Sequence, residues 1–300
     1  MPSFHPVSAS LFQFHQPTPM SRGIKKWSEK RITELQNEGR GRGHHASYQP
    51  WVRITDFHSR GRTHAPYSYR TGRNHELLSD GENETFAMLE WRLDNADIRE
   101  QFPLDRDISL EIAHEIGVPH PYYPGTNVPY VMTLDFLVTR IVDGQEVLKA
   151  YSVKEQKALT PDVVERLEIE HAICSGMGLS YDLIIKERLP HAKVRNLLWI
   201  RKAQLEPDAA EAYPGFYEEH QSRMVHDLAA TSFSGSLVDY CTNYDRRCSV
   251  DTGTGMRVAR MLLANRALSM DLNNPSPERA PLASFQLSAV PGRLRSVGGA

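Results

Sequence analysis

Residues 131–138 read VMTLDFLV, residues 143–144 are Asp-Gly, and residues 147–154 read VLKAYSVK. Both runs alternate in the manner of β-strands, and Asp-Gly is a preferred two-residue hairpin turn. The stretch therefore predicts a β-hairpin around which a sheet can be built.

This hairpin predicts a candidate catalytic pair. If Asp143 and Gly144 form the turn, Asp135 lies opposite Ser152, and the two-residue period places both on one face with Lys154. Directly opposed residues lie about 5 Å apart. A carboxylate beside an ammonium suits metal-assisted phosphodiester hydrolysis, with Asp holding Mg²⁺ and Lys orienting water or stabilising charge. An exposed salt bridge would leave the same pattern, and spacing alone does not separate the two.

A second informative stretch, residues 77–91, reads LLSDGENETFAMLEW. Ser79 followed three residues later by Glu82 forms the capping box of a helix. Glu82 also shares its helix face with Phe86 and Leu89, so it begins the apolar stripe. A carboxylate directed at a core is costly unless it is paired or binds metal. Glu82 is therefore either a helix cap or a site carboxylate.

Composition places the chain among ordinary globular proteins. Its 300 residues predict two domains, with 40% apolar and 24% charged residues. We find no apolar run of about 18 residues and no secretory signal pattern, so we expect a cytoplasmic protein without a membrane partner. Cys174, Cys241 and Cys248 have no CxxC spacing, which argues against structural zinc and a disulfide scaffold.

The order of elements predicts an α/β sandwich with a mixed sheet. The helix that starts at Thr160-Pro161 should bury a stripe consisting of Val163, Val164, Leu167, His171 and Cys174. Residues 181–185 should form a buried strand. We expect a tail over residues 1–22 and this α/β domain over residues 23–205.

The C-terminal third has a different pattern. Three helices, near residues 208–230, 235–245 and 253–265, precede a strand near 266–272, which is the order of a winged helix. Arg257, Arg260 and Arg266 on or near the third helix are compatible with contact to DNA or to protein. The expected domain covers 206–272, with a disordered tail over 273–300.

A basic region lies near the N-terminus. Residues 22–73 contain 12 Lys or Arg against 4 Asp or Glu, interleaved with aromatic residues. Basic and aromatic side chains together suit contact with a nucleic-acid backbone. Arg60, Arg62, Arg70 and Arg73 are the candidate phosphate contacts, and the alternative is a solvated basic arm.

Several ordered motifs carry a family resemblance. They are YQPW (48–51), SRGR (59–62), SYRTGR (68–73), LLSD (77–80) with Glu82, LEW (89–91), DIREQFPL (97–104), TLDFLV (133–138) and VK (153–154). In this order they resemble the TnsA endonuclease subunit of heteromeric, transposon-seven-like bacterial transposases. The resemblance covers residues 38–202 and is weak over the C-terminal third.

The resemblance implies a type II restriction-endonuclease-like fold. The metal-binding glutamate and aspartate of the family fall on Glu82 and Asp135, and its lysine falls on Lys154. The carbonyl of Val153 should also face the metal, which we expect to be Mg²⁺ with Mn²⁺ as a substitute. The chain departs from the family at Ser152, where Glu or Gln is usual, so Ser152 would be a weak or water-mediated ligand.

The resemblance also implies a role in cut-and-paste transposition. The family nicks the 5′ strands of transposon-end DNA, while an integrase-like transposase subunit processes the 3′ strands and an ATPase regulator subunit controls the complex. Two other readings stay open: a stand-alone nuclease of the same fold, and a catalytically silent assembly protein. Ser152 favours the hypothesis of a catalytically silent assembly protein, whereas the presence of Glu82, Asp135 and Lys154 argues against that hypothesis.

Overall fold

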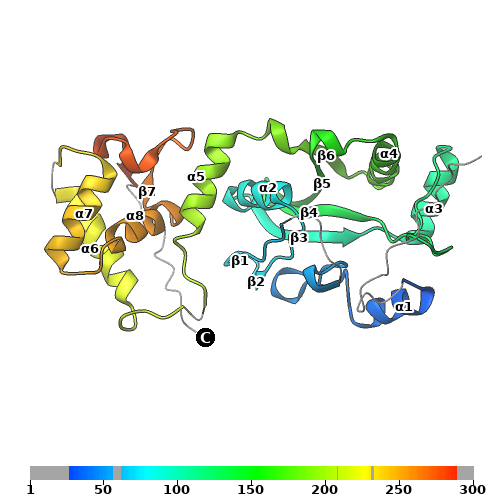
Figure 1. Ribbon diagram of the computed structural model, residues 1–300, viewed down its shortest axis with the longest axis horizontal. Helices are drawn as coiled ribbons and strands as arrows, with labels where there is room; N and C mark the ends of the chain where they lie inside the picture. The colour runs from blue at the N-terminus through cyan, green and yellow to red at the C-terminus, as the bar shows by residue number, and fades with distance from the viewer. Residues whose placement is uncertain (1–26, 57–61, 208, 231–232, 289–300) are drawn as a thin grey trace, which may run out of the picture.

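A four-stranded mixed sheet forms the centre of the protein (Figure 1). The computed structural model describes residues 27–56, 62–207, 209–230 and 233–288. The strand order is β3-β4-β5-β6; β3, β4 and β5 are antiparallel neighbours, and β6 is parallel to β5. The strands are β3 (Asn95–Pro103), β4 (Thr133–Val142), β5 (Gln145–Lys154) and β6 (Ser180–Ile185). The mixed sheet agrees with the expectation from sequence.

The hairpin β4–β5 has the predicted turn and register. Asp143 and Gly144 both have positive φ, 51° and 76°, as a two-residue type I′ turn requires. Val142 pairs with Gln145, and the ladder continues to Phe136 opposite Tyr151. One further step in this register places Asp135 opposite Ser152, as the Asp-Gly turn predicted.

Helices cover both faces of the sheet. Helix α2 (Asp80–Trp91) covers one face, and α3 (Arg106–Glu115) and α4 (Pro161–Gly176) pack together on the other. Helix α5 (His191–Arg201) packs against α2 and α8. The core under α2 consists of Leu77, Phe86, Leu89, Ile98, Phe136, Val138, Tyr151 and Val153. The core under α4 includes Leu134, Leu137, Ala150, Ile169, Ile173 and Cys174. Each fully buried Leu, Ile, Val or Phe side chain contributes about 1.5–3 kcal/mol relative to exposure, so the two cores hold the sheet between its helices.

The remaining N-terminal elements are short. Helix α1 (Glu29–Asn37) ends before Gly39, whose φ of 84° stops the helix as expected. It lies toward the end of the molecule that α3 also occupies (Figure 1). The two-stranded ribbon of β1 (Tyr67–Ser68) and β2 (Arg73–Asn74) contributes the basic loop beside β3.

Two burial predictions for the second half of this domain were wrong. Leu167 and Cys174 are buried on α4, but Val164 and His171 are exposed, and Glu170 is buried instead. The difference arises because α4 turns a polar group toward the sheet, where Ser152 and Tyr181 bond to it. Strand β6 is an edge strand, so its side chains are half-buried or exposed rather than fully buried.

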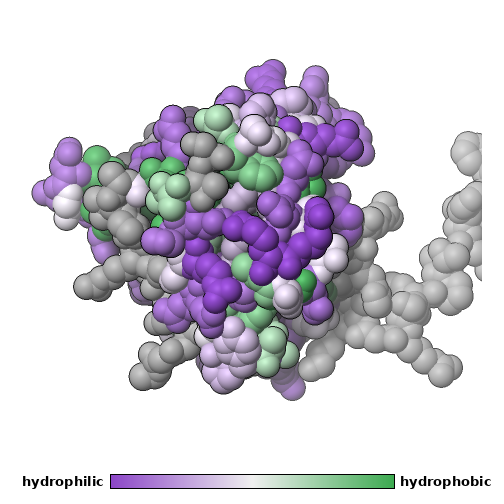
Figure 2. All heavy atoms as spheres, turned by 90° about the vertical axis from the view of Figure 1, so that its left-hand side faces the viewer, coloured by the Kyte–Doolittle hydropathy of each residue, from purple (hydrophilic) through white to green (hydrophobic). Residues whose placement is uncertain are grey.

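The C-terminal part has its own core at the other end of the molecule (Figure 1). It contains α6 (Phe216–Ala230), α7 (Leu237–Cys248), α8 (Thr254–Ala264), β7 (Leu268–Ser269) and β8 (Gln286–Leu287). Three helices followed by a short strand is the predicted order, and the winged-helix assignment stays a prediction. Hydrophilic side chains cover most of this end, with small separate apolar groups (Figure 2).

The predicted C-terminal tail is ordered over residues 273–288. β8 pairs with β7, and Leu282 and Phe285 join the helical core, because these apolar side chains bury area against the helices. The side chain of Asn196 on α5 donates to the carbonyls of Leu272 and Asn274 at the start of this segment. The predicted N-terminal tail, residues 1–22, lies outside the described residues.

Among the described residues, the helices lack the combination of length and apolar composition that spanning a bilayer requires.

Candidate active site

The predicted Asp135–Lys154 pair is present at the end of the hairpin. Asp135 Oδ2 accepts hydrogen bonds from the backbone N–H of Val153 at 2.6 Å and from Nζ of Lys154 at 2.8 Å. Lys154 Nζ also donates to the carbonyl of Val153 at 3.0 Å. The side chains are 13% and 26% exposed, so this is not the exposed surface ion pair that sequence left open.

Lys154 is held in its charged form. Burial acts to lower the pKa of its ammonium, but the negative charges of Asp135, Glu170 and Glu82 outweigh burial and raise the pKa. An ammonium fixed by a carboxylate and a carbonyl can stabilise charge on a phosphate or orient a water molecule.

Glu82 lies in the first turn of α2, in surroundings that fit both of the roles that sequence left open. Ser79 Oγ accepts from the Glu82 N–H at 3.1 Å and caps the helix. The Glu82 carboxylate accepts from Leu78 N at 2.9 Å and from Ser79 Oγ at 3.0 Å. It is also only 6% exposed, and burial together with the charge of Asp135 raises its pKa to about 7. The cap thus presents a buried carboxylate to the site.

Gln101 contacts the Glu82 carboxylate, and sequence reasoning missed this residue. Its Nε2 donates to Glu82 at 3.2 Å, and its Oε1 accepts from Thr133 Oγ1 at 3.3 Å. Its backbone φ of 48° is unusual for a residue with a side chain inside a strand. Such strained positions cluster at functional sites because the surrounding structure must hold them in place.

Glu170 is the second residue that sequence reasoning missed. Only 7% exposed, it accepts hydrogen bonds from Ser152 Oγ and, at 3.1 Å, from the Tyr181 hydroxyl. Burial, reinforced by the charge of Asp135, raises its pKa to about 7. The sequence does contain a pattern that indicates burial of Glu170, because Leu167, Glu170 and Cys174 share a helix face at spacings of three and four. Glu170 therefore brings a carboxylate to the strand position where Ser152 has none.

The donor set suits a hard divalent cation. Glu82, Asp135 and Glu170 are buried carboxylates, and Lys154 supplies only one compensating charge. Over the described part of the chain, no three His, Cys, Asp or Glu side chains are arranged to hold an ion by themselves. Mg²⁺ is commonly held by one or two carboxylates, with water and substrate phosphate completing its octahedron. These residues fit that mode of binding.

Gly81 allows the first turn of α2 to approach strand β5 at Val153. A Cβ built at Gly81 would lie 3.2 Å from Cγ1 of Val153, which is a tight contact. We expect Gly81→Val to lower the free energy of unfolding by about 1–3 kcal/mol through overpacking, and to lower any activity of the site about tenfold by displacing Glu82. Urea denaturation and an assay of phosphodiester cleavage would measure the two effects. Gly176→Val is the matched control, because nothing lies within 4 Å of a Cβ there; equal losses in both variants would contradict this role.

The candidate DNA-binding arginines are in different environments. Arg73 forms two 2.7 Å bonds to the Glu100 carboxylate, and its side chain is 9% exposed. Arg70 donates to the carbonyls of Asn95 and Glu90. Both side chains thus have partners within the chain, and their phosphate contacts stay predictions. Arg62 is 74% exposed and 3.0 Å from Asp80, whereas Arg60 lies outside the described residues.

Two arginines of α8 and one that follows it, Arg257, Arg260 and Arg266, point toward the rest of the protein. Arg257 donates to the carbonyl of Ala203, Arg260 to that of Trp199, and Arg266 to that of Trp91. Arg260 and Arg266 also stack on the indole rings of the same tryptophans. Their contacts join the C-terminal part to α5 and α2, so we do not assign these arginines to DNA.

Comparison with known proteins identifies the family of the chain. Residues 94–186 match the family described as TnsA-like endonuclease N terminal, and residues 189–272 match TnsA endonuclease C terminal. Asp135, Lys154 and Glu170 lie within the first match, and Glu82 precedes it. The chain is also 31% identical over 254 residues to the transposon Tn7 transposition protein TnsA of Escherichia coli, covering 84% of this chain and 90% of that protein. The chain therefore belongs to the TnsA endonuclease family.

Proposed function

We propose that this chain is the endonuclease subunit of a transposon-seven-like transposase and nicks the 5′ strands at transposon ends with Mg²⁺. One observation carries the chemistry: Asp135, Lys154, Glu82 and Glu170 come from four elements and form one buried acidic cluster around an ammonium. The strand choice and the setting come from the family resemblance. The similar Escherichia coli protein is named for Tn7 transposition.

In this proposal Asp135 and Glu82 hold the cation, with the carbonyl of Val153 and the carboxylate of Glu170 beside them. When bound, Mg²⁺ would activate water and neutralise charge on the scissile phosphate, and Mn²⁺ should substitute for it. Lys154 orients the water or stabilises the phosphate. Ser152 donates its hydroxyl hydrogen bond to Glu170, so its role is to position that carboxylate.

Two further subunits belong to the proposal: an integrase-like transposase that processes the 3′ strands and an ATPase regulator. The structure weakens the hypothesis of a catalytically silent assembly protein. That hypothesis rested on the absence of a carboxylate at position 152, and Glu170 brings a carboxylate next to Ser152. The remaining alternative is a stand-alone nuclease of the same fold.

Strand-specific cleavage separates these readings. A transposon-end duplex labelled on the 5′ strand would be incubated with the chain and Mg²⁺, with and without the partner transposase. We expect a 5′-strand nick that requires both the metal and the partner. Equal cutting by the chain alone would indicate a stand-alone nuclease, and no cutting with any metal or partner would leave only the assembly role.

We expect Glu170→Gln to lower nicking on the order of 10²-fold, because an amide oxygen carries no charge to offset the cation or to balance Lys154. Single-turnover nicking in Mg²⁺ measures the effect. Glu168→Gln is the control, since Glu168 is an exposed carboxylate on the same helix. Similar rates in the two variants would remove Glu170 from the active site.

We expect Arg62→Gln to weaken binding to any duplex and to reduce the slope of log affinity against log salt by about one, as loss of one phosphate contact does. The measurement is a salt titration of duplex binding by anisotropy. Arg223→Gln is the control, because Arg223 forms a comparable surface ion pair with Glu219 on α6. An unchanged salt slope in Arg62→Gln would mean that this guanidinium does not reach DNA.

A further inference from the structure

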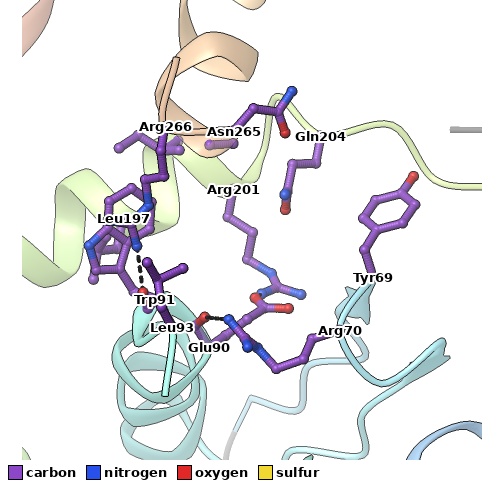
Figure 3. A pocket seen from close by; sticks show the side chains of 13 residues that line it. Tyr69, Arg70, Glu90, Trp91, Leu93, Leu197, Arg201, Gln204, Asn265 and Arg266 are labelled. Carbon is purple, nitrogen blue, oxygen red and sulfur yellow. Dashed lines mark hydrogen bonds and ion pairs between the residues drawn. The ribbon is translucent and has the colours of Figure 1, made fainter. Parts of the chain in front are cut away.

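A cavity of about 750 Å³ lies away from the catalytic cluster, where the C-terminal end of α2 meets α5 and the end of α8 (Figure 3). The loop that follows β1 closes its remaining side with Tyr69 and Arg70. The other labelled lining residues are Glu90, Trp91, Leu93, Leu197, Arg201, Gln204, Asn265 and Arg266. Four segments that are distant in sequence thus build one concave site.

Positive charge predominates in this cavity. Arg70, Arg201 and Arg266 line it, and Glu90 is the single carboxylate of the lining. Arg201 pairs with Glu90, Arg70 donates to the Glu90 carbonyl at 3.0 Å, and Arg266 donates to the Trp91 carbonyl at 2.5 Å. The Glu90 carboxylate offsets the charge of Arg201, whereas the backbone carbonyls that orient Arg70 and Arg266 carry no net charge, so the lining stays positive.

Burial makes this positive charge costly. Burial lowers the pKa of Arg201 to about 10, although Glu206, outside the lining, acts in the opposite direction. Burial and the charge of Arg70 lower the pKa of Arg266 to about 10 as well. Both groups remain charged at neutral pH, so an anion that enters the cavity would offset the charge of Arg266, which Arg70 repels where water screens poorly.

The walls of the cavity are apolar. Leu197 and Ile200 of α5, Ala87 of α2 and the Trp91 indole contribute to them, and Leu93 at the rim is 76% exposed. Apolar walls with a few placed polar groups are typical of a binding concavity. A DNA backbone offers phosphates but no aliphatic or aromatic side chain to fill such a cavity.

We propose that this cavity is a docking site for a short acidic peptide segment of a partner protein, with carboxylates flanking one aliphatic or aromatic side chain. The carboxylates would face Arg201 and Arg266, and the apolar side chain would pack between Trp91 and Leu93. The peptide would lie at the C-terminal end of the helix whose first turn carries Glu82.

Displayed short peptides of random sequence, selected on the full chain, test the site without knowledge of the partner. The enriched sequences should combine acidic with large apolar residues. A selected peptide, made synthetically with a fluorophore, should bind Arg266→Gln about tenfold more weakly than the parent. Arg260→Gln is the matched control: Arg260 also stacks on a tryptophan and donates to its carbonyl, but it is outside the cavity lining.

Gln204 provides a second pair of variants that should fold normally. Gln204→Glu is nearly isosteric and should weaken the same peptide severalfold, whereas Gln204→Lys should strengthen binding. Selection of sequences without acidic residues, or equal affinity in all four variants, would overturn the proposal. It would also be overturned if a DNA duplex displaced the peptide and lost affinity with Arg266→Gln, because the site would then bind phosphate.

Discussion

Asp135→Asn should abolish strand nicking, with a loss on the order of 10³-fold or more. The substitution keeps the shape of the side chain but removes the charge that holds both Lys154 and the proposed cation. Asp135 Oδ2 accepts two hydrogen bonds, from Val153 N and Lys154 Nζ, and an amide oxygen can still accept them. The variant should therefore fold, and it should bind duplex DNA at least as tightly because one negative charge near the phosphate is gone.

Single-turnover cleavage of a 5′-labelled transposon-end duplex, with the partner transposase and Mg²⁺, measures this loss. Asp182→Asn is the matched control, because Asp182 on β6 forms a 2.7 Å ion pair with Lys149 on the same sheet outside the cluster. Circular dichroism and DNA binding would be recorded for both variants. A nicking rate in Asp135→Asn comparable to that of the control would refute the catalytic assignment.

Glu100→Gln should lower the free energy of unfolding by about 3–5 kcal/mol, the usual cost of breaking a buried ion pair from one side. Glu100 is fully buried on β3. Its carboxylate accepts two bonds from Arg73, one from His75 Nδ1 at 2.7 Å, and one from Glu76 N at 2.9 Å. The glutamine would leave the Arg73 guanidinium without its counter-charge. The expected loss is a large fraction of the free energy of unfolding of a typical domain.

The same carboxylate predicts how stability depends on pH. Burial acts to raise the pKa of Glu100, but the charges and hydrogen bonds of His75 and Arg73 outweigh it and lower the pKa from 4.5 to about 2. A carboxylate with a depressed pKa stabilises the fold above pH 4.5 and loses that contribution as the pH falls toward 2. The loss is about 3 kcal/mol, and Glu100→Gln should not show it.

Urea denaturation at neutral and acidic pH measures both effects. Glu219→Gln is the control, because Glu219 forms an exposed ion pair with Arg223 and such pairs contribute little to stability. A Glu100→Gln protein as stable as this control, or one with the parent's loss of stability in acid, would contradict the structural role of the Arg73–Glu100 pair.

Local patterns predicted the relative positions of several residues of the candidate active site. The Asp-Gly turn admits one register, so the positions of Asp135, Ser152 and Lys154 on one face follow from the two-residue strand period. The Ser79–Glu82 spacing likewise specifies a helix start. These relationships join residues close in sequence or linked by one tight turn, and so they were readable without coordinates.

Other features depended on side chains that meet across the fold. Glu170 had the spacing of a buried position on α4, but only the packing of that helix on β5 showed that Ser152 receives it. Arg73 and Arg62 lie in the same basic region of the sequence. Only the position of β3 beside Arg73 showed that Arg73 binds Glu100. Charge and hydrophobic periodicity do not specify a partner at long sequence separation.

Sequence patterns were enough to predict the hairpin, its register, the helix cap, and the Asp135–Lys154 pair with Glu82 as a candidate. The contacts of Glu170 in the acidic cluster, the partners of Arg70 and Arg73 within the chain, and the packing of residues 273–288 on the helices became visible only in the folded structure. The cavity between α2, α5 and α8 is another feature that is visible only in the tertiary structure. The physical reason is that backbone periodicity and turns act over a few residues, whereas burial and ion pairing depend on which distant surfaces come into contact.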